Sequence, residues 1–132
     1  MIVDTSAIVA ILLGETGAAT LEEALVRSST ARMSAASYVE LCAAVHRPDR
    51  PEIIRNLDRL LLAYGIRIEP LDEAQARVAA QAYRDYGRGS AHPARLNLGD
   101  AFSYALASVT GEPLLFVGDD FARTDIRPAV TV

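Results

Sequence analysis

Residues 96–121, LNLGDAFSYALASVTGEPLLFVGDDF, decide the fold that this chain is expected to adopt. Their pattern predicts an apolar helix followed by a short buried strand over residues 114–117. Asp100 stands at the head of the helix, and Asp119 and Asp120 follow the strand directly. An open α/β sheet binds its ligands outside the carboxyl ends of its strands. The stretch therefore predicts an α/β fold with an acidic site at one edge of the sheet.

The beginning of the chain repeats this arrangement. Residues 2–3 predict a buried strand, and Asp4 follows it. Asp4, Thr5 and Ser6 offer capping side chains to a short helix over residues 7–13. Because two strands each end in carboxylates, the sequence favours one acidic site that both strands share.

Apolar periodicity and turn residues predict the remaining elements. Helices are expected over residues 16–26, 35–46, 51–64 and 73–86. Strands are expected over residues 31–33, 67–69 and, at an edge of the sheet, 129–132. Residues 87–95 are rich in Gly, Ser, Pro and Arg, which predicts a mobile loop. Short strands that alternate with helices predict a parallel sheet covered on both faces.

Length and composition predict one domain over residues 1–132. A chain of 132 residues with 51% hydrophobic composition can bury a sizeable core. Its apolar stretches are shorter than the about 20 residues that a membrane helix needs. The chain starts without a basic segment or a small-residue cleavage site of a secretory signal. A cytoplasmic location without a membrane partner is therefore expected.

Charge and missing motifs exclude several classes of function. The net charge of −4 lacks the basic balance typical of nucleic-acid binders, and all thirteen positive residues are Arg. A phosphoryl-accepting receiver domain needs a Lys, which this chain lacks. A haloacid-dehalogenase-type phosphatase has a second Asp two residues after the first, where this chain has Ser6. The single cysteine, Cys42, is expected in the core, and no phosphate-binding loop or dinucleotide motif is present.

Glu40 is the most informative acid. In SAASYVELCAAV, residues 34–45, it interrupts a helix that is otherwise small and apolar. A lone carboxylate on such a face is costly unless it is paired or binds a cation. Other interpretations stay open, because Glu40 could face solvent, Asp4 and Asp100 could only cap helices, and the pair at 119–120 could lie in a plain turn.

Considered together, the acids favour a metal site. Clustered carboxylates raise one another's pKa, and a hard divalent cation relieves their repulsion. All-oxygen ligands suit Mg²⁺ or Mn²⁺ better than zinc. Such an ion, held by carboxylates with water in its open positions, can activate that water for phosphodiester hydrolysis without a protein nucleophile.

The chain resembles the PIN-domain ribonucleases, and specifically the VapC toxins of bacterial type II toxin–antitoxin systems. Four segments in order carry the resemblance: MIVDTSAIVAIL at the start, SAASYVELCAAV, then YGRGSAHPARLNLGDAFSYALA and LLFVGDDFARTDI. The resemblance implies a PIN-like three-layer α/β/α sandwich around a short parallel sheet. It also implies a Mg²⁺- or Mn²⁺-dependent endoribonuclease that cleaves structured RNA, tRNA or ribosomal RNA, and thereby inhibits translation.

The same resemblance implies the residues of the site. Asp4 and Asp100 are expected to bind the metal, and Glu40 and a fourth acid complete the site. Asp120, which stands directly before Phe121, fits the family pattern best, and Asp119 is the close alternative.

Supporting residues are also expected around these acids. Thr5 or Ser6 either orients a ligand or the attacking water or caps the helix. Asn97 either binds nearby backbone or phosphate or caps the next helix. RNA binding is expected from three residues that flank the loop before the site: Arg84, Arg88 and Arg95.

The expected partners are a VapB-type antitoxin and a second copy of the chain, in a homodimer and in a hetero-oligomer with the antitoxin. A C-terminal antitoxin segment would cover the active site, often with an Arg among the acids. The apolar residues around 10–13 and 57–61 offer a surface for either partner. A non-catalytic RNA- or partner-binding module of this fold and a metal-dependent DNA nuclease remain the alternatives, because no residue identifies a reader of the 2′-OH.

Overall fold

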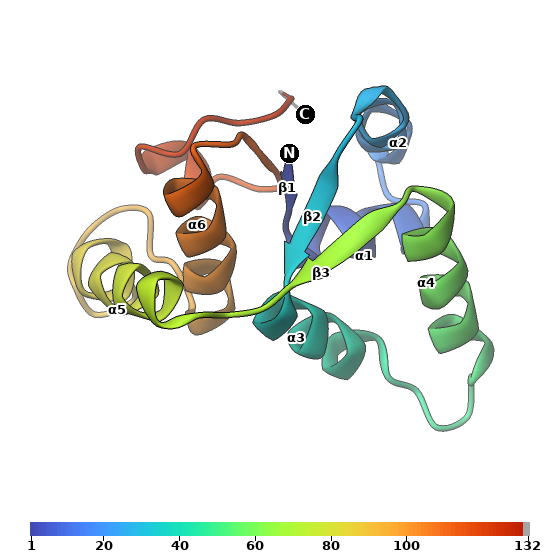
Figure 1. The fold of residues 1–132 in the computed structure, drawn as a ribbon. Helices are drawn as coiled ribbons and strands as arrows, with labels where there is room; N and C mark the ends of the chain where they lie inside the picture. The colour runs from blue at the N-terminus through green and yellow to red at the C-terminus, as the bar shows by residue number, and fades with distance from the viewer. Residues whose placement is uncertain (131–132) are drawn as a thin grey trace.

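The computed structural model describes residues 1–130 of the chain (Figure 1). Its centre is a four-stranded parallel sheet with the strand order β3-β2-β1-β4. The strands are β1 (Ile2–Val3), β2 (Ala31–Ser34), β3 (Ile66–Glu69) and β4 (Leu114–Leu115). The helices are α1 (Thr5–Leu13), α2 (Ala18–Arg27), α3 (Ala35–Val45), α4 (Glu52–Ala63), α5 (Glu73–Tyr86) and α6 (Leu98–Thr110), with a 3₁₀ turn, η1 (Phe121–Arg123).

Two apolar layers cover the two faces of the sheet. Successive side chains of a strand point to opposite faces of the sheet. Val3 therefore packs with buried side chains of α1 to α4, while Ile2 packs with those of α5 and α6. Figure 1 shows α5 and α6 on one side of the sheet and α1, α2 and α4 on the other, with α3 next to the ends of the strands. The predicted three-layer α/β/α sandwich with a short parallel sheet is confirmed.

The chain order brings the acids to one edge of this sheet. Because all four strands are parallel, their carboxyl ends lie at the same edge, and α1, α3 and α6 each have their N-terminus there (Figure 1). Gly111 ends α6 in the left-handed conformation, with a φ of 67°, which leads the chain back into β4. At this edge α1 and α3 directly follow β1 and β2, whereas α6 reaches the edge after α5 and the loop behind it.

The structure differs from the predicted elements in local details. Strand β4 ends at Leu115, two residues earlier than predicted, and α2 spans Ala18–Arg27 instead of residues 16–26. The predicted edge strand at 129–132 lies partly outside the described residues. The edge pairing starts earlier, because Leu114 N donates to Arg127 O at 2.9 Å and Ala129 N donates to Leu114 O at 2.7 Å.

The apolar residues predicted as a docking surface are mostly core. Leu57 and Leu61 are only 0% and 8% exposed and pack against α1, so the prediction for residues 57–61 is wrong. Leu13 and Leu62 of the same two helices remain 62% and 83% exposed. In the part of the chain that the structure describes, no helix combines the length and the apolar character that crossing a membrane requires.

Candidate metal centre

Asp4 is a buried acid at the edge of the sheet where the strands have their carboxyl ends. It follows β1 as the N-cap of α1, and only 3% of its surface is exposed. Its Oδ2 accepts hydrogen bonds from the backbone N of Ser6 at 2.9 Å and from Ser6 Oγ at 2.7 Å. Its Oδ1 accepts a hydrogen bond from Ser103 Oγ at 2.5 Å. These donors compensate a buried carboxylate and fix its orientation.

The serines that bind Asp4 are themselves held by other segments. Val117 N, just after β4, donates to Ser6 Oγ at 3.1 Å. Ser103 Oγ, on α6, lies 3.1 Å from Ser37 Oγ on α3, and both serines are buried. Asp4 is thereby linked to the three other segments that surround the acidic edge.

Glu40 approaches this group from α3. Its Oε2 accepts a hydrogen bond from Thr5 Oγ1 at 3.2 Å. Its carboxylate lies against Gly99 of α6 so closely that a Cβ at Gly99 would be 2.1 Å from Oε1. Burial raises the pKa of Glu40, the hydrogen bond from Thr5 opposes this change, and the charge of Asp4 adds to it. The close fit explains why the first turn of α6 contains a glycine here.

Asp100 lies in the first turn of α6 and forms a capping box with Asn97. Asn97 N donates to Asp100 Oδ2 at 2.7 Å, and Asp100 N donates to Asn97 Oδ1 at 2.9 Å. The pKa of Asp100 is raised to about 7, mainly by burial. The hydrogen bond from Asn97 opposes this shift, and the charges of Asp4, Asp120 and Glu40, in that order, add to it.

The two acids after β4 differ in their relation to Asp100. Both Asp119 and Asp120 are exposed, and Asp120 directly precedes η1. The charge of Asp120 contributes to the raised pKa of Asp100, whereas Asp119 is not among the contributing charges. Phe121 is buried and packs on Phe116 with ring centroids 5.1 Å apart, which anchors the turn. Of the two candidates, Asp120 is thus the acid that acts electrostatically on the group.

We call Asp4, Glu40, Asp100 and Asp120 the acidic site. Within residues 1–130, no three His, Cys, Asp or Glu side chains form a ready-made metal-binding cluster. The charges of the other three acids nevertheless raise the pKa of Asp100, and the charge of Asp4 raises that of Glu40. Among the described residues, no Arg forms a salt bridge with the acidic site. A donor set of carboxylate oxygens fits Mg²⁺ or Mn²⁺, which keep several waters.

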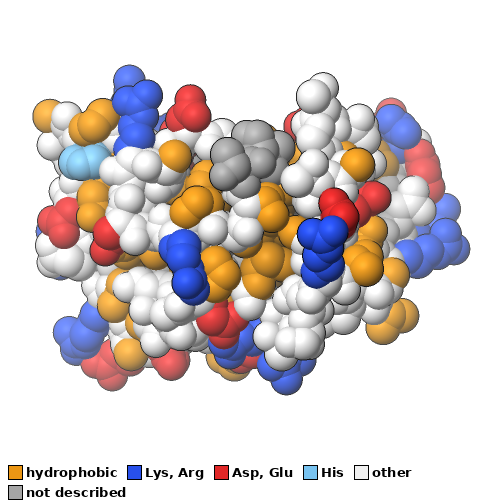
Figure 2. Space-filling model, turned by 90° about the horizontal axis from the view of Figure 1, so that it is seen from above, with side chains coloured by type: hydrophobic (Ala, Val, Ile, Leu, Met, Phe, Trp, Pro, Cys, Tyr) orange, Lys and Arg blue, Asp and Glu red, His pale blue; other side chains and the backbone are white. Residues whose placement is uncertain are grey.

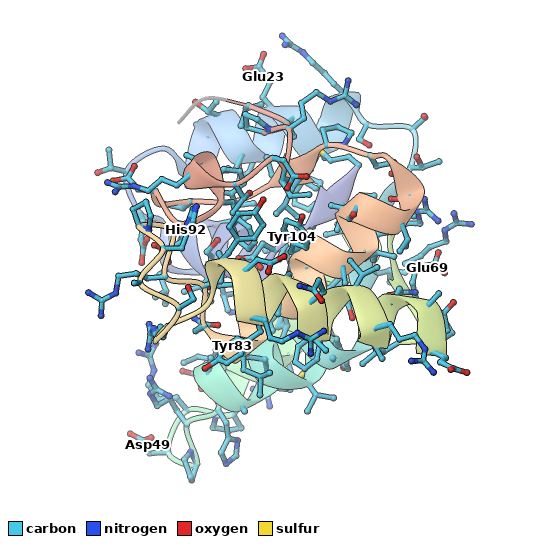
Figure 3. The ribbon with its side chains drawn as sticks, turned by 90° about the vertical axis from the view of Figure 1, so that its left-hand side faces the viewer. Glu23, Asp49, Glu69, Tyr83, His92 and Tyr104 are labelled. Atoms are coloured by element: carbon cyan, nitrogen blue, oxygen red, sulfur yellow. The ribbon has the colours of Figure 1, made fainter. Side chains whose placement is uncertain are left out.

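The loop before α6 leads directly into the acidic site. Arg88 N donates to Leu96 O at 3.0 Å and Leu96 N donates to Tyr86 O at 2.9 Å, so the two ends of the loop are tied together. Arg88 and Arg95 are exposed on it, and Arg95 adopts a positive φ of 53°. Arg84 is exposed on α5 and donates to Gln81 Oε1 at 2.7 Å. Figure 3 shows the loop, on which His92 is labelled, beside one end of α5.

The sequence comparisons agree with this geometry. A family model described as "PIN domain" matches residues 1–127. The chain belongs to the PIN-domain family. Ribonuclease VapC42 of Mycobacterium tuberculosis is 73% identical over 131 residues, which cover 99% of this chain and 100% of that protein. Ribonuclease VapC28 of the same species is 49% identical over 130 residues, 98% of each chain. The PIN domain described here is therefore one of the VapC ribonucleases.

Two solved structures share the fold of this PIN domain. M. tuberculosis VapC20, described as a toxin that cleaves the sarcin–ricin loop, matches with a TM-score of 0.72 and 18% identity over 95% of both chains. A toxin–antitoxin complex from Klebsiella pneumoniae matches with a TM-score of 0.66 and 18% identity, over 92% of this chain and 89% of that one. At these identities the likeness concerns the fold of the PIN domain.

The predicted supporting residues have specific places in the PIN domain. Thr5 and Ser6 lie inside the first turn of α1, where they donate hydrogen bonds to Glu40 and Asp4. Of the two interpretations that the sequence left open for them, helix capping is therefore wrong, and the orientation of a ligand stays a prediction. Asp4 itself is the cap because its backbone is still extended. Asn97 caps α6, one of the two interpretations that the sequence left open.

Sequence reasoning missed three residues of this site: Ser37, Gly99 and Ser103. The available signal was spacing, because Ser37 precedes Glu40 by three positions and Ser103 follows Asp100 by three. Residues three apart share one face of a helix. Gly99 gave only a weak signal, a glycine in the first turn of a helix.

Proposed function

We propose that this VapC ribonuclease is a divalent-cation-dependent endoribonuclease that acts as the toxin of a VapBC-type toxin–antitoxin pair. The acidic site, Asp4, Glu40, Asp100 and Asp120, would hold Mg²⁺ or Mn²⁺. Structured RNA, tRNA or ribosomal RNA, is the proposed substrate, and its cleavage would inhibit translation. Membership of the VapC ribonucleases supports the reaction, and the acidic edge supports the cation.

The observation that carries this proposal is the state of Asp100. Its pKa of about 7 reflects burial near three other carboxylates that no Arg neutralises among residues 1–130. Such an arrangement costs stability unless a positive charge joins it. A bound cation would remove this cost and would leave the carboxylates ionised near neutral pH.

The residues of the chain prepare this reaction by holding the acids in place. When bound, the cation supplies a Lewis acid and an activated water for attack on a phosphodiester. Ser6 and Ser103 keep Asp4 oriented, and Asn97 keeps Asp100 against the first turn of α6. Thr5 donates a hydrogen bond to Glu40 Oε2, which keeps the Glu40 carboxylate next to the start of α1, where Asp4 lies.

The RNA would be held by the Arg residues near the loop. Arg84, Arg88 and Arg95 are exposed, and in the described part of the chain none of them is in a salt bridge. Phosphate groups of RNA bind such exposed guanidinium groups, and this binding weakens as salt rises. The net charge of −4 makes local contacts of this kind necessary.

The proposed partners are a VapB-type antitoxin and a second copy of the chain. The related Klebsiella pneumoniae structure is a toxin–antitoxin complex, which supports an antitoxin partner for this fold. Leu13 of α1 and Leu62 of α4 are 62% and 83% exposed, which supports an apolar partner segment on that side. We place the action of the protein in the cytoplasm, where tRNA and ribosomal RNA take part in translation.

The decisive experiment is cleavage of a structured RNA by the purified protein. We expect cleavage with Mg²⁺ or Mn²⁺, none after chelation, and a loss of about 1,000-fold in rate in Asp4→Ala and in Asp100→Asn. Asp100→Asn retains an oxygen that can accept the hydrogen bond of the capping box, so this variant should stay folded. A loss of cleavage in it is then not caused by unfolding, which Asp4→Ala alone would not show. Cleavage that persists unchanged in both variants, or cleavage of DNA in place of RNA, would overturn the proposal. RNA binding without cleavage would identify a non-catalytic module.

A paired substitution separates the two candidates for the fourth acid. We expect Asp120→Asn to lose about 10- to 100-fold in cleavage rate, because Asp120 acts on Asp100. Asp119→Asn, its exposed neighbour, is the matched control and should cleave like the unmodified protein. The reverse order of effects would assign the fourth position to Asp119.

A further inference from the structure

Two buried serines connect the helices that carry Glu40 and Asp100. Ser37 lies on α3 three residues before Glu40, and Ser103 lies on α6 three residues after Asp100. Their hydroxyl oxygens are 3.1 Å apart, and the two residues are 0% and 1% exposed. The contact joins positions 66 residues apart in the chain. It therefore fixes the faces of α3 and α6 relative to each other at the level of the acidic site.

The hydrogen bonds between the serines and Asp4 have only one consistent direction. A carboxylate accepts and does not donate, so Ser103 must donate its single hydroxyl proton to Asp4 Oδ1. The remaining bond to Ser103 Oγ must then be donated by Ser37. The result is a chain of donors that runs from Ser37 through Ser103 to Asp4. Charge-assisted bonds of this kind are the stronger ones, and a donor that is itself a hydrogen-bond acceptor is polarised further.

Counting acceptors shows what this chain leaves free. An ionised carboxylate has about four acceptor positions, two on each oxygen. Ser6 takes two positions on Oδ2 of Asp4, and Ser103 takes one position on Oδ1. One position remains, and it is on Oδ1, the same oxygen that Ser103 orients.

We propose that Ser37 and Ser103 are positioning residues, which direct Oδ1 of Asp4 and the acids of α3 and α6 toward one divalent cation. The inference rests on the proposed function, because it concerns the cation of the same acidic site. Ser103 acts directly on Asp4. Ser37 acts only through Ser103, so its effect depends on the presence of the Ser103 hydroxyl.

The test measures Mn²⁺ binding by calorimetry in four forms of the full-length protein: unmodified, Ser37→Ala, Ser103→Ala and the double variant. We expect Ser103→Ala to weaken Mn²⁺ binding about 10- to 100-fold, and Ser37→Ala to weaken it less. The double variant should resemble Ser103→Ala alone, because the chain of donors is already broken. In RNA cleavage kcat should fall while KM for RNA stays unchanged.

Two further variants control for folding. Ser108→Ala changes an exposed serine on the same helix and should bind Mn²⁺ like the unmodified protein. Ser103→Cys retains a weak donor of similar shape and should lie between the unmodified protein and Ser103→Ala. Thermal unfolding of each variant, followed by circular dichroism, identifies a loss of structure.

The outcomes distinguish this inference from the proposed function. If the unmodified protein binds no Mn²⁺, the proposed function fails and the positioning role fails with it. If the unmodified protein binds Mn²⁺ and a folded Ser103→Ala binds it equally well, only the positioning role is overturned. Independent, additive effects of the two serines would also overturn it, because Ser37 would then act by another route.

Discussion

The acidic residues at the two ends of the sheet differ in whether they have basic partners. Beyond the amino end of β4, Glu112 accepts hydrogen bonds from the N-terminal amine of Met1 and from Arg32. Figure 2 views the molecule from the side of the chain termini, and acidic and basic side chains lie next to one another at several places there. At the carboxyl end, the acidic site has no Arg partner among the described residues.

The charges at the two ends of the sheet point to different roles for the acids there. At the amino end the chain supplies its own positive charges, so the acid contributes to the fold without an external ligand. At the carboxyl end the chain supplies only hydroxyl and amide donors, which orient carboxylates but leave the net negative charge in place. The positive charge must then come from outside, as a cation for cleavage or as an Arg of an antitoxin for inhibition.

Among the predictions that compare the two ends of the sheet, the largest expected effect is that of Gly99→Ala at the carboxyl end. The added Cβ would be 2.1 Å from Glu40 Oε1, so the Glu40 carboxylate must move away. We expect RNA cleavage and Mn²⁺ affinity to fall about 10- to 100-fold. Helix α6 should still form, because Ala favours a helix over Gly by about 1 kcal/mol.

A double variant tests whether Gly99→Ala acts through Glu40. In a Glu40→Gln background, Gly99→Ala should cause little further loss of cleavage, because the displaced carboxylate is already gone. Full activity of a folded Gly99→Ala protein would show that the position of Glu40 is unimportant, and the acidic site would lose one of its members.

At the amino end, Glu112→Gln should change stability and leave cleavage unaffected. The substitution leaves Arg32 half-buried with a weaker partner, so we expect the free energy of unfolding to fall by about 2 kcal/mol. The matched control is Glu23→Gln, which breaks an exposed helical pair with Arg27 and should cost less than about 0.5 kcal/mol. Denaturant unfolding measures both changes. A loss of Mn²⁺ binding in Glu112→Gln would contradict the separation of the two ends.

The smallest expected effect is a pH dependence of stability without divalent cations. Burial and neighbouring charges raise the pKa of Asp100 from 3.8 to about 7 in the folded state. The folded state then holds a proton that the unfolded state has released, so stability falls as the pH rises from about 4 through about 7. Asp100 is partly exposed to solvent, which limits its contribution to about 1–2 kcal/mol.

Thermal unfolding at about pH 5 and at about pH 8 measures this contribution. The loss on going to the higher pH should be smaller in Asp100→Asn, which has no proton to release there. Added Mg²⁺ should reduce the loss in the unmodified protein, because the cation favours the ionised carboxylate. Equal pH dependence in both proteins would show that Asp100 ionises normally in the fold.

Much of the fold could be predicted from local pattern. Residues 2–3 and 114–117 read as strands because short apolar runs were bounded by turn and acidic residues, and α3, α4 and α5 began within one residue of their predicted positions. The errors concern the lengths of elements and surfaces. Strand β4 is shorter than its apolar run, because after Leu115 the chain turns away toward η1. Leu57 and Leu61 were assigned to a surface because periodicity gives a helix an apolar face but not its partner.

Local sequence pattern predicted Asp4 directly after a strand, Glu40 on an apolar helix and Asp100 at the head of another helix. The parallel topology brings the ends of these elements to one edge of the sheet. The contact between Ser37 and Ser103, and the fit of Glu40 against Gly99, follow from the packing of α3 on α6 and not from local pattern. The tertiary structure also separated Asp120 from Asp119, adjacent residues that the sequence left nearly equivalent. The physical reason is that periodicity fixes which residues share a face of one helix. Contacts between helices depend on how closely those faces pack.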